Sequence, residues 1–120
     1  MSIIEIKDYQ EYIDLIQNTH YIKLLIFSKE NCSACNKSLI KSKKLLQSFD
    51  SKKLIFKEIK MYSDNQKNLA NSKIFENYRI NFVPSYVLIY NNTCEIMRDP
   101  EIRYVKERIK YILKLKDFSP

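Results

Sequence analysis

The sequence predicts an α/β protein with a central mixed β-sheet flanked by helices, in the order β-α-β-α-β-α-β-β-α. Two observations carry this prediction. Apolar, β-prone runs recur at 21–28, 54–62 and 85–90, and the segments between them repeat apolar residues at helical spacing. Helices that alternate with strands imply a sheet covered on both faces. The chain has 120 residues, 45% of them hydrophobic, and we expect a single domain over residues 1–120.

The N-terminal half begins with a short apolar run at 2–6, which we interpret as an edge or first strand. Asp8 then starts a helix, and Glu11 three residues later completes a capping box. The segment 21–28 is almost continuously apolar, which is typical of a strand buried on both sides. A second helix follows and is expected to run to about residue 49.

The second half adds a strand at 54–62 and a polar helix at 63–79. The residues of this helix that we expect to face inward are Leu69, Ile74, Phe75 and Tyr78. A strand at 85–90 leads to the pair Asn91–Asn92. Because asparagine tolerates positive φ, this pair can close a hairpin onto a strand at 93–98.

The last helix is predicted to start at Asp99 and Pro100, with aspartate as N-cap and proline as the first helical residue. Its expected buried stripe is Val105, Ile109, Ile112 and Leu113. Lysines lie on the other side of this helix and of the second helix, where we expect a solvated face; they are Lys37, Lys41, Lys44, Lys106, Lys110 and Lys114. For the second helix, attraction of an acidic partner, with Lys43 included, is the alternative.

The chain contains no glycine at all. Phosphate-binding P-loops, the GxGxxG dinucleotide motif, the GxSxG nucleophile elbow and the EF-hand loop all need glycine where the backbone meets a ligand or φ becomes positive. The sequence therefore excludes all four of these sites.

The formal charge of +7 comes from 21 Lys and Arg against 14 Asp and Glu. These charges are spread evenly along the sequence, without a basic tail, so we expect no nucleic-acid partner. No apolar run approaches the length of a membrane span, and we expect no membrane partner. With three cysteines and no secretory signal, the expected location is a reducing, cytoplasmic one.

The motif with the clearest chemistry is Cys32-Ser33-Ala34-Cys35, between the strand 21–28 and the second helix. Thiols three residues apart lie one helical turn apart and can close a small disulfide. The N-terminus of a helix favours the thiolate. Cys35 falls on the inward stripe of the helix, while Cys32 lies at its exposed end. An exposed thiolate attacks a disulfide and a sheltered thiol resolves the mixed disulfide, which needs neither metal nor organic cofactor.

Two other interpretations of the cysteine pair remain open. It can be half of a structural zinc site, for which the available further ligands are His20 and Cys94. It can also be silent in redox chemistry and belong to a protein-binding module. His20 is expected in a loop and Cys94 as a free thiol in the strand 93–98.

The chain resembles the thioredoxin family over essentially its full length. The strand YIKLLIFS, Glu30 two residues before Cys32 and the motif CSAC are similar to that family's active-site segment. Val83-Pro84 before the strand SYVLIY resembles its cis-proline loop. The resemblance implies a single thioredoxin-like domain with a redox-active Cys32–Cys35 disulfide. It also implies a cis Pro84, and a Val83 whose backbone groups pair with an extended substrate peptide.

The chain departs from the family's pattern at several positions. Tryptophan before the first cysteine is replaced by Asn31, and Gly-Pro between the cysteines by Ser33-Ala34. The buried acid that the family carries in the preceding strand falls at Ile26. Without glycine, the turns must be made by other residues, for which we expect Asn81, Asn91, Asn92 and Asp99.

The sequence thus predicts a thiol–disulfide oxidoreductase with catalytic Cys32 and Cys35 and substrate-binding Val83 and Pro84. Expected partners are protein disulfides or dithiols and an unidentified recycling reductase or oxidase, and the expected state is a monomer. The expected site holds no metal and no cofactor.

Overall fold

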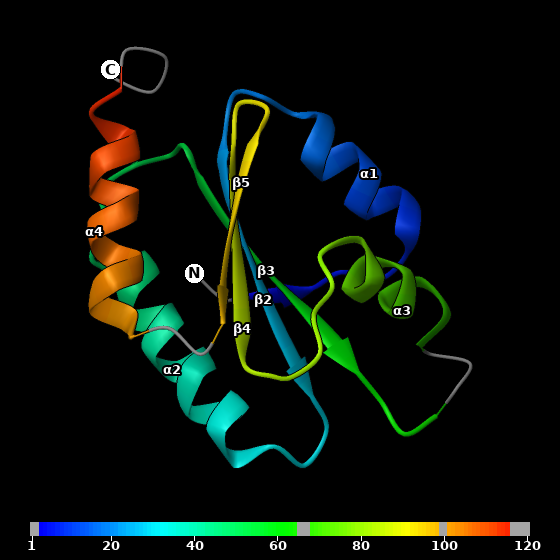
Figure 1. The fold of residues 1–120 in the computed structure, drawn as a ribbon. Helices are drawn as coiled ribbons and strands as arrows, with labels where there is room; N and C mark the ends of the chain where they lie inside the picture. The colour runs from blue at the N-terminus through cyan, green and yellow to red at the C-terminus, as the bar shows by residue number, and fades with distance from the viewer. Residues whose placement is uncertain (1–2, 65–67, 99–100, 116–120) are drawn as a thin grey trace.

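The computed structural model describes residues 3–64, 68–98 and 101–115. Its elements follow the predicted order (Figure 1). They are β1 (Ile4–Glu5), α1 (Tyr9–Gln17), β2 (Ile22–Lys29), α2 (Ser33–Gln47), β3 (Leu54–Met61), α3 (Asn68–Asn77), β4 (Ser85–Tyr90), β5 (Thr93–Arg98) and α4 (Ile102–Leu113).

The five strands form one mixed sheet in the order β1-β3-β2-β4-β5. β1, β3 and β2 are parallel, while β4 is antiparallel to both β2 and β5. Ile26 lies opposite Glu58 of β3 and Tyr86 of β4, and Phe27 lies opposite Ser85. β2 is therefore the central strand, and the loop after it leaves from the middle of the end of the sheet at which β2 finishes.

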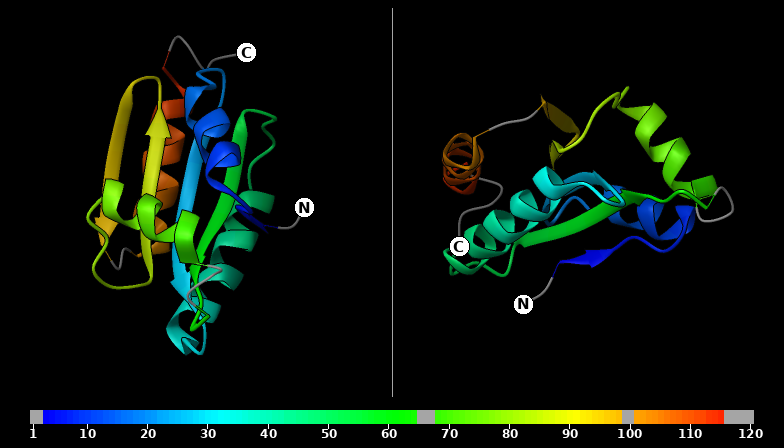
Figure 2. Two further views of the ribbon diagram at one scale, coloured as in Figure 1. Left: turned by 90° about the vertical axis from the view of Figure 1, so that its right-hand side faces the viewer. Right: turned by 90° about the horizontal axis from the view of Figure 1, so that it is seen from below.

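The helices cover both faces of the sheet, as predicted: α2 and α4 lie on one face, and α1 and α3 on the other (Figures 1 and 2). Alternate residues of β2 feed two cores. Leu24 and Ile26 pack with residues of α2 and α4, whereas Leu25 and Phe27 pack with residues of α1 and α3. Every residue from 22 to 28 is buried, which confirms the strand buried on both sides.

The N-terminal helix begins as predicted, with Asp8 as N-cap. Its carboxylate accepts from the Glu11 backbone N–H at 2.8 Å. Glu11 accepts in turn from the backbone N–H of Lys7 at 2.9 Å, one residue before the position that a standard capping box uses. The preceding strand is shorter than predicted, because only Ile4 and Glu5 pair with β3.

The inward face of α3 was predicted correctly in part. Ile74 is fully buried, and Phe75 and Tyr78 are partly buried against the same core. Leu69 is 76% exposed, so its predicted inward position is wrong. The physical reason is helical geometry: five residues separate Leu69 from Ile74, which places them about 140° apart around the helix axis.

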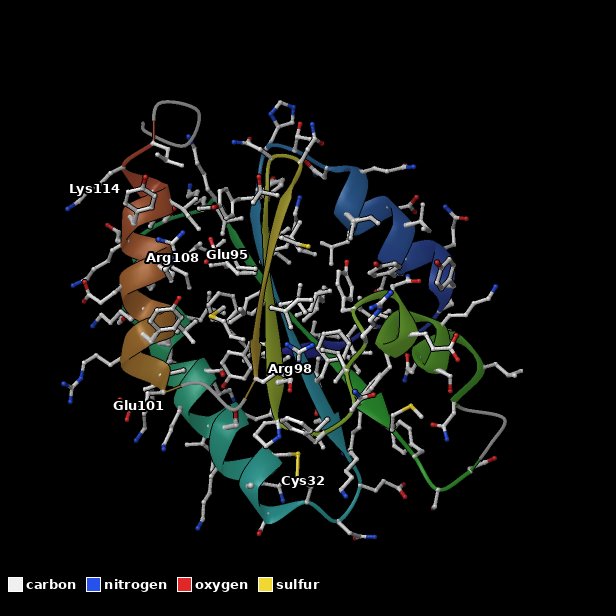
Figure 3. The ribbon with its side chains drawn as sticks, in the orientation of Figure 1. Cys32, Glu95, Arg98, Glu101, Arg108 and Lys114 are labelled. Atoms are coloured by element: carbon white, nitrogen blue, oxygen red, sulfur yellow. A yellow bond between two sulfur atoms is a disulfide. The ribbon has the colours of Figure 1, made fainter. Side chains whose placement is uncertain are left out.

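The last helix has Glu101 as N-cap and begins at Ile102. The predicted start at Asp99 and Pro100 lies outside the described residues. Arg108 attaches α4 to the sheet, because its guanidinium donates to both carboxylate oxygens of Glu95 on β5, at 2.8 and 2.6 Å (Figure 3). Tyr90 donates to the same carboxylate at 2.8 Å. The Arg108 hydrogen bonds, followed by Tyr90, lower the pKa of Glu95, with burial opposing them.

Three described residues take the positive φ that glycine usually supplies: Asn31 at 55°, Arg79 at 52° and Asn91 at 53°. Asn91 and Asn92 form the turn of the β4–β5 hairpin, as predicted, and the positive φ is at Asn91. Asn81 does not take a positive φ; Arg79, two residues earlier, does. Within the ranges that the structure describes, no helix combines the length and apolarity that crossing a membrane requires.

Candidate active site

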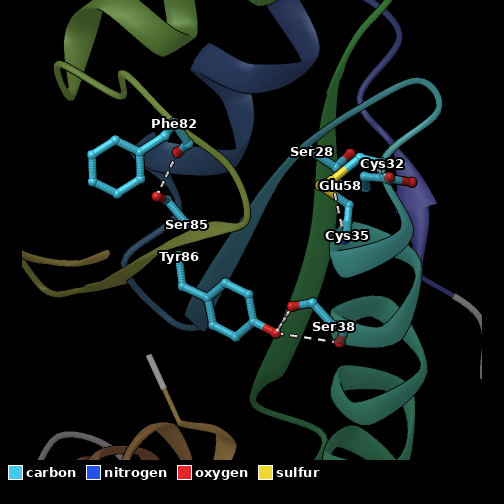
Figure 4. Close-up of a disulfide and its surroundings, with 8 residues drawn as sticks. All are labelled: Ser28, Cys32, Cys35, Ser38, Glu58, Phe82, Ser85 and Tyr86. Atoms are coloured by element: carbon cyan, nitrogen blue, oxygen red, sulfur yellow. Dashed lines mark hydrogen bonds between the residues drawn. A yellow bond between two sulfur atoms is a disulfide. The ribbon is translucent and has the colours of Figure 1, made fainter. Parts of the chain in front are cut away.

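The cysteine pair lies where β2 passes into α2. Asn31, with its positive φ, turns the chain, and Cys32 follows as the N-cap of α2. Cys32 and Cys35 form a disulfide, with Cα atoms 5.2 Å apart, and the Cys35 backbone N–H donates to Cys32 Sγ at 3.1 Å (Figure 4). Cys32 is partly exposed, while Cys35 is 1% exposed. The two sulfur atoms therefore differ in access, as the sequence predicts.

Glu30 fixes the loop that precedes the pair. Its carboxylate accepts from the backbone N–H and the hydroxyl of Ser63, at 3.2 and 2.8 Å. Its own backbone N–H donates to the Met61 carbonyl at 2.9 Å. The loops that follow β2 and β3 are thus tied together beside the N-terminus of α2.

Pro84 reaches the same end of the sheet from β4. The Val83–Pro84 peptide bond is cis, and the next residue, Ser85, lies opposite Phe27 near the end of β2. Ser85 is buried and its hydroxyl donates to the Phe82 carbonyl at 2.8 Å, which holds the loop onto the start of β4.

A buried carboxyl group, Glu58, lies beneath the cysteine pair. It is 7% exposed and accepts from the hydroxyl of Ser28 at 2.5 Å; Ser28 itself is 1% exposed. By strand alternation both side chains point to the face that α2 covers, where Cys35 is buried in the first helical turn. Figure 4 shows Ser28 and Glu58 beside the disulfide.

No known protein-family profile and no curated protein sequence matches the chain. Solved structures do. A thioredoxin from Trypanosoma brucei brucei superposes with a TM-score of 0.75 at 15% identity, covering 95% of this chain and 93% of its own. For reduced Schistosoma mansoni thioredoxin the TM-score is 0.71 at 19% identity, covering 92% and 98%. Oxidised mitochondrial thioredoxin 3 from Saccharomyces cerevisiae gives 0.71 at 16% identity, covering 91% and 94%. This chain has the thioredoxin fold.

Within this thioredoxin fold, a cavity of about 480 Å³ opens beside the disulfide. Ala34 from the cysteine motif and Pro84 both line it, so the structure brings the two sequence motifs together. Val83 does not line this cavity; it lines another, of about 270 Å³, with Phe75 and Phe82.

Tyr86 on β4 also lines the cavity beside the disulfide. It is 2% exposed, and its hydroxyl forms hydrogen bonds with the hydroxyls of Ser38 and Ser42, at 2.6 Å for Ser42. Ser42 donates to the Ser38 carbonyl at 2.8 Å. These contacts join α2 to β4 and hold the cavity wall in place.

The further zinc ligands considered from the sequence lie at the other end of this thioredoxin fold. His20 is exposed in the turn before β2, and Cys94 is an exposed free thiol on β5, opposite Ile89. Ile89 pairs with Lys23 near the start of β2, whereas Cys32 follows the end of that strand. Within the ranges that the structure describes, no three His, Cys, Asp or Glu residues lie together as a metal site.

Sequence reasoning missed Glu58 as a site residue. The resemblance to the thioredoxin family places the buried acid at position 26, where this chain has isoleucine. The structure puts Glu58 directly opposite Ile26 on the neighbouring strand. The sequence did contain one signal. Because side chains alternate between the two faces of a strand, Glu58 lies on the same buried face of β3 as Leu54 and Phe56, where a charged residue is unusual.

Proposed function

We propose that this protein is a thiol–disulfide oxidoreductase that acts on protein substrates through Cys32 and Cys35. The observation that carries the proposal is the Cys32–Cys35 disulfide at the N-terminus of α2, with Cys32 partly exposed and Cys35 buried. The thioredoxin fold and the adjoining cis Pro84 support it.

In the reductive direction, the Cys32 thiolate attacks one sulfur of a substrate disulfide. A Cys32–substrate disulfide forms, and the other substrate sulfur leaves as a thiolate. Cys35 then loses its proton and attacks Cys32 Sγ, which forms the Cys32–Cys35 disulfide and releases the second substrate thiolate. Two electrons and two protons pass from the dithiol to the substrate. A reductase or an oxidase must restore the starting state.

The N-terminus of α2 assists the first step, because unpaired backbone N–H groups and the helix dipole favour a thiolate at Cys32. Glu58 assists the second. As a buried carboxyl beneath the first turn of α2, it accepts the proton of Cys35 and returns it to the leaving thiolate. Pro84 lines the cavity beside the cysteine pair, and the backbone of Val83 pairs with an extended substrate segment.

A cytoplasmic location and a single, monomeric domain complete the proposal. The exposed free thiol of Cys94 is compatible with a reducing compartment, because such compartments keep thiols reduced.

The decisive experiment is reduction of a disulfide-bonded test protein, such as insulin, with a dithiol as electron donor. We expect activity in the wild type, loss of activity in Cys32→Ser, and a stable mixed disulfide with Cys35→Ser. Cys94→Ser, which removes the other thiol, is the matched control and should retain activity. If the wild type is inactive and Cys32 is alkylated no faster than Cys94, the protein is a redox-silent binding module instead.

A further inference from the structure

The charge of this protein is even along the sequence but uneven in space. α2 and α4 together carry eight basic residues and one acidic residue, whereas α1 and α3 together carry one basic and three acidic residues. Because α2 and α4 cover the same face of the sheet, the helices on that face carry a net charge of +7, and those on the other face a net charge of −2 (Figures 1 and 2).

Two adjoining cavities lie between these two helices. The cavity beside the disulfide, about 480 Å³, shares Lys41 and Ile102 with a second cavity of about 340 Å³. We call the two together the α2–α4 groove. Its disulfide end is marked by Ala34 and Pro84. Figure 3 shows that Cys32 and Glu101 lie at the same end of α2 and α4.

Five cationic side chains line the α2–α4 groove: Lys37, Lys41, Lys44, Arg103 and Lys106. The acidic residue lining it is Glu101, at the disulfide end. None of the five forms a salt bridge with a carboxylate among residues 3–64, 68–98 and 101–115. The charge of these five side chains is therefore not neutralised by a salt bridge within the described residues.

One of these cations occupies a position that the helix itself disfavours. Arg103 lies in the first turn of α4, which contains no acidic residue. The N-terminus of a helix carries partial positive charge, so a cation there lowers helix stability by about 0.3–1 kcal/mol. Leu45 and Ile102 add apolar surface to the lining of the groove. The groove therefore offers both positive charge and an apolar floor.

We infer that the α2–α4 groove binds an acidic segment of the protein substrate, next to the cysteine that reacts with Cys32. This inference rests on the proposed oxidoreductase function and names its substrate class. The ten residue-to-residue steps from Ala34 to Lys44 correspond to about 15 Å of helix. An extended peptide covers that distance with about four or five residues. Acidic residues about two to five positions from the reactive cysteine would reach the lysines.

The test compares synthetic peptides that each contain one disulfide to a small thiol. One set has three glutamates two to five positions from the cysteine, on either side, and the matched set has glutamine instead. With the full-length reduced protein, we expect kcat/KM to be about tenfold higher for a glutamate peptide at low salt. The ratio should fall toward one as the ionic strength rises, because salt screens exposed charges.

The matched variants each remove three positive charges. The groove variant is Lys41→Gln, Lys44→Gln and Lys106→Gln, and we expect its glutamate-to-glutamine ratio to fall to about one. The control variant is Lys7→Gln, Lys52→Gln and Lys73→Gln, at positions that are exposed and lie outside the groove. It should keep most of the preference. Circular dichroism and thermal unfolding show whether each variant is folded.

The outcomes separate this inference from the proposed function. If the wild type reduces neither peptide set, the oxidoreductase proposal fails. If it reduces both sets equally, or if the control variant loses the preference as fully as the groove variant, the inference is overturned and the function stands. Tighter binding of a duplex oligonucleotide than of the glutamate peptide, abolished in the groove variant, would overturn it by making this face a nucleic-acid surface.

Discussion

Glu58 is the residue on which proton transfer to and from Cys35 is proposed to depend. The Glu58→Gln variant keeps the shape and the capacity to accept from Ser28, but it cannot take up a proton at the carboxylate. We expect the first attack by Cys32 to be unchanged and the resolution of the mixed disulfide to slow by about 10²-fold, the lower range of general acid–base catalysis. Single-turnover quenched-flow analysis of the mixed disulfide measures the two steps separately.

The matched control for Glu58→Gln is Glu76→Gln, on the exposed face of α3. That variant should resolve the mixed disulfide at the wild-type rate. Resolution by Glu58→Gln at the wild-type rate would show that the buried carboxyl serves only the packing beneath α2. Slowing of both steps alike would point to a distorted helix N-terminus rather than to proton transfer.

Cys32 could be assigned to the site from the sequence, whereas Glu58 could not. The positions of Cys32 and Cys35 follow from local spacing, because one helix start determines which thiol is exposed. Glu58 belongs to the site only because β3 pairs with β2 in the register that places it opposite Ile26. Register between strands whose paired residues are 32 positions apart is a tertiary property, which no local pattern in this sequence specifies.

At the scale of elements, the end of α3 shows how a chain without glycine closes a helix. Arg79 occupies the position after the helix that glycine usually fills, with φ of 52°. The Ile80 N–H donates to the Phe75 carbonyl at 2.9 Å and the Arg79 N–H to the Glu76 carbonyl at 3.1 Å, the two hydrogen bonds of a Schellman motif. A left-handed conformation costs a residue with a Cβ about 1–2 kcal/mol.

Arg79→Gly should therefore stabilise the protein, because glycine adopts this conformation without that cost. Glycine also gains freedom in the unfolded chain, so we expect a net increase of about 0.5–1 kcal/mol in the free energy of unfolding. Urea denaturation measures it. Asn81→Gly, two residues further along at a position with negative φ, is the control and should lower stability. An equal response of both variants would contradict the explanation.

The elements themselves were largely predictable from periodicity and turn chemistry. The strands in the middle of the sheet and the N-cap at Asp8 follow from sequence, because each depends on residues next to one another. The exceptions lie at the ends of elements. β1 pairs over two residues, and Leu69, in the first turn of α3, lies about 140° around the helix axis from the buried Ile74. Apolar residues at the end of an element can face solvent without disturbing the core.

At the scale of the whole molecule, the order of charges along the sequence does not show how they are distributed over the faces of the folded protein. Residues 33–47 and 102–113 are far apart in the chain, yet the fold places both helices on one face of the sheet. An even count along the sequence therefore becomes a basic face. The sequence also does not reveal that a charged residue is buried. Lys23 of β2 lies within an almost continuously apolar run, and in the folded sheet it is completely buried.

Lys23 makes the stability of the whole protein depend on pH in the alkaline range. Burial lowers the pKa of its amine below the ordinary 10.5, and Nζ donates to the Asn18 carbonyl. In the unfolded chain the amine keeps its proton up to a pH of about 10.5, whereas in the folded protein it loses the proton at a lower pH. Between these two pH values the unfolded state binds more protons than the folded state. The free energy of unfolding therefore rises with pH in this range. Lys23→Met removes the cost, and we expect it to be about 1 kcal/mol more stable at neutral pH, with the difference shrinking as the pH rises. Urea denaturation at a series of pH values measures it. Exposed Lys52→Met should show no such trend, and a Lys23→Met variant that is less stable at every pH would refute the argument.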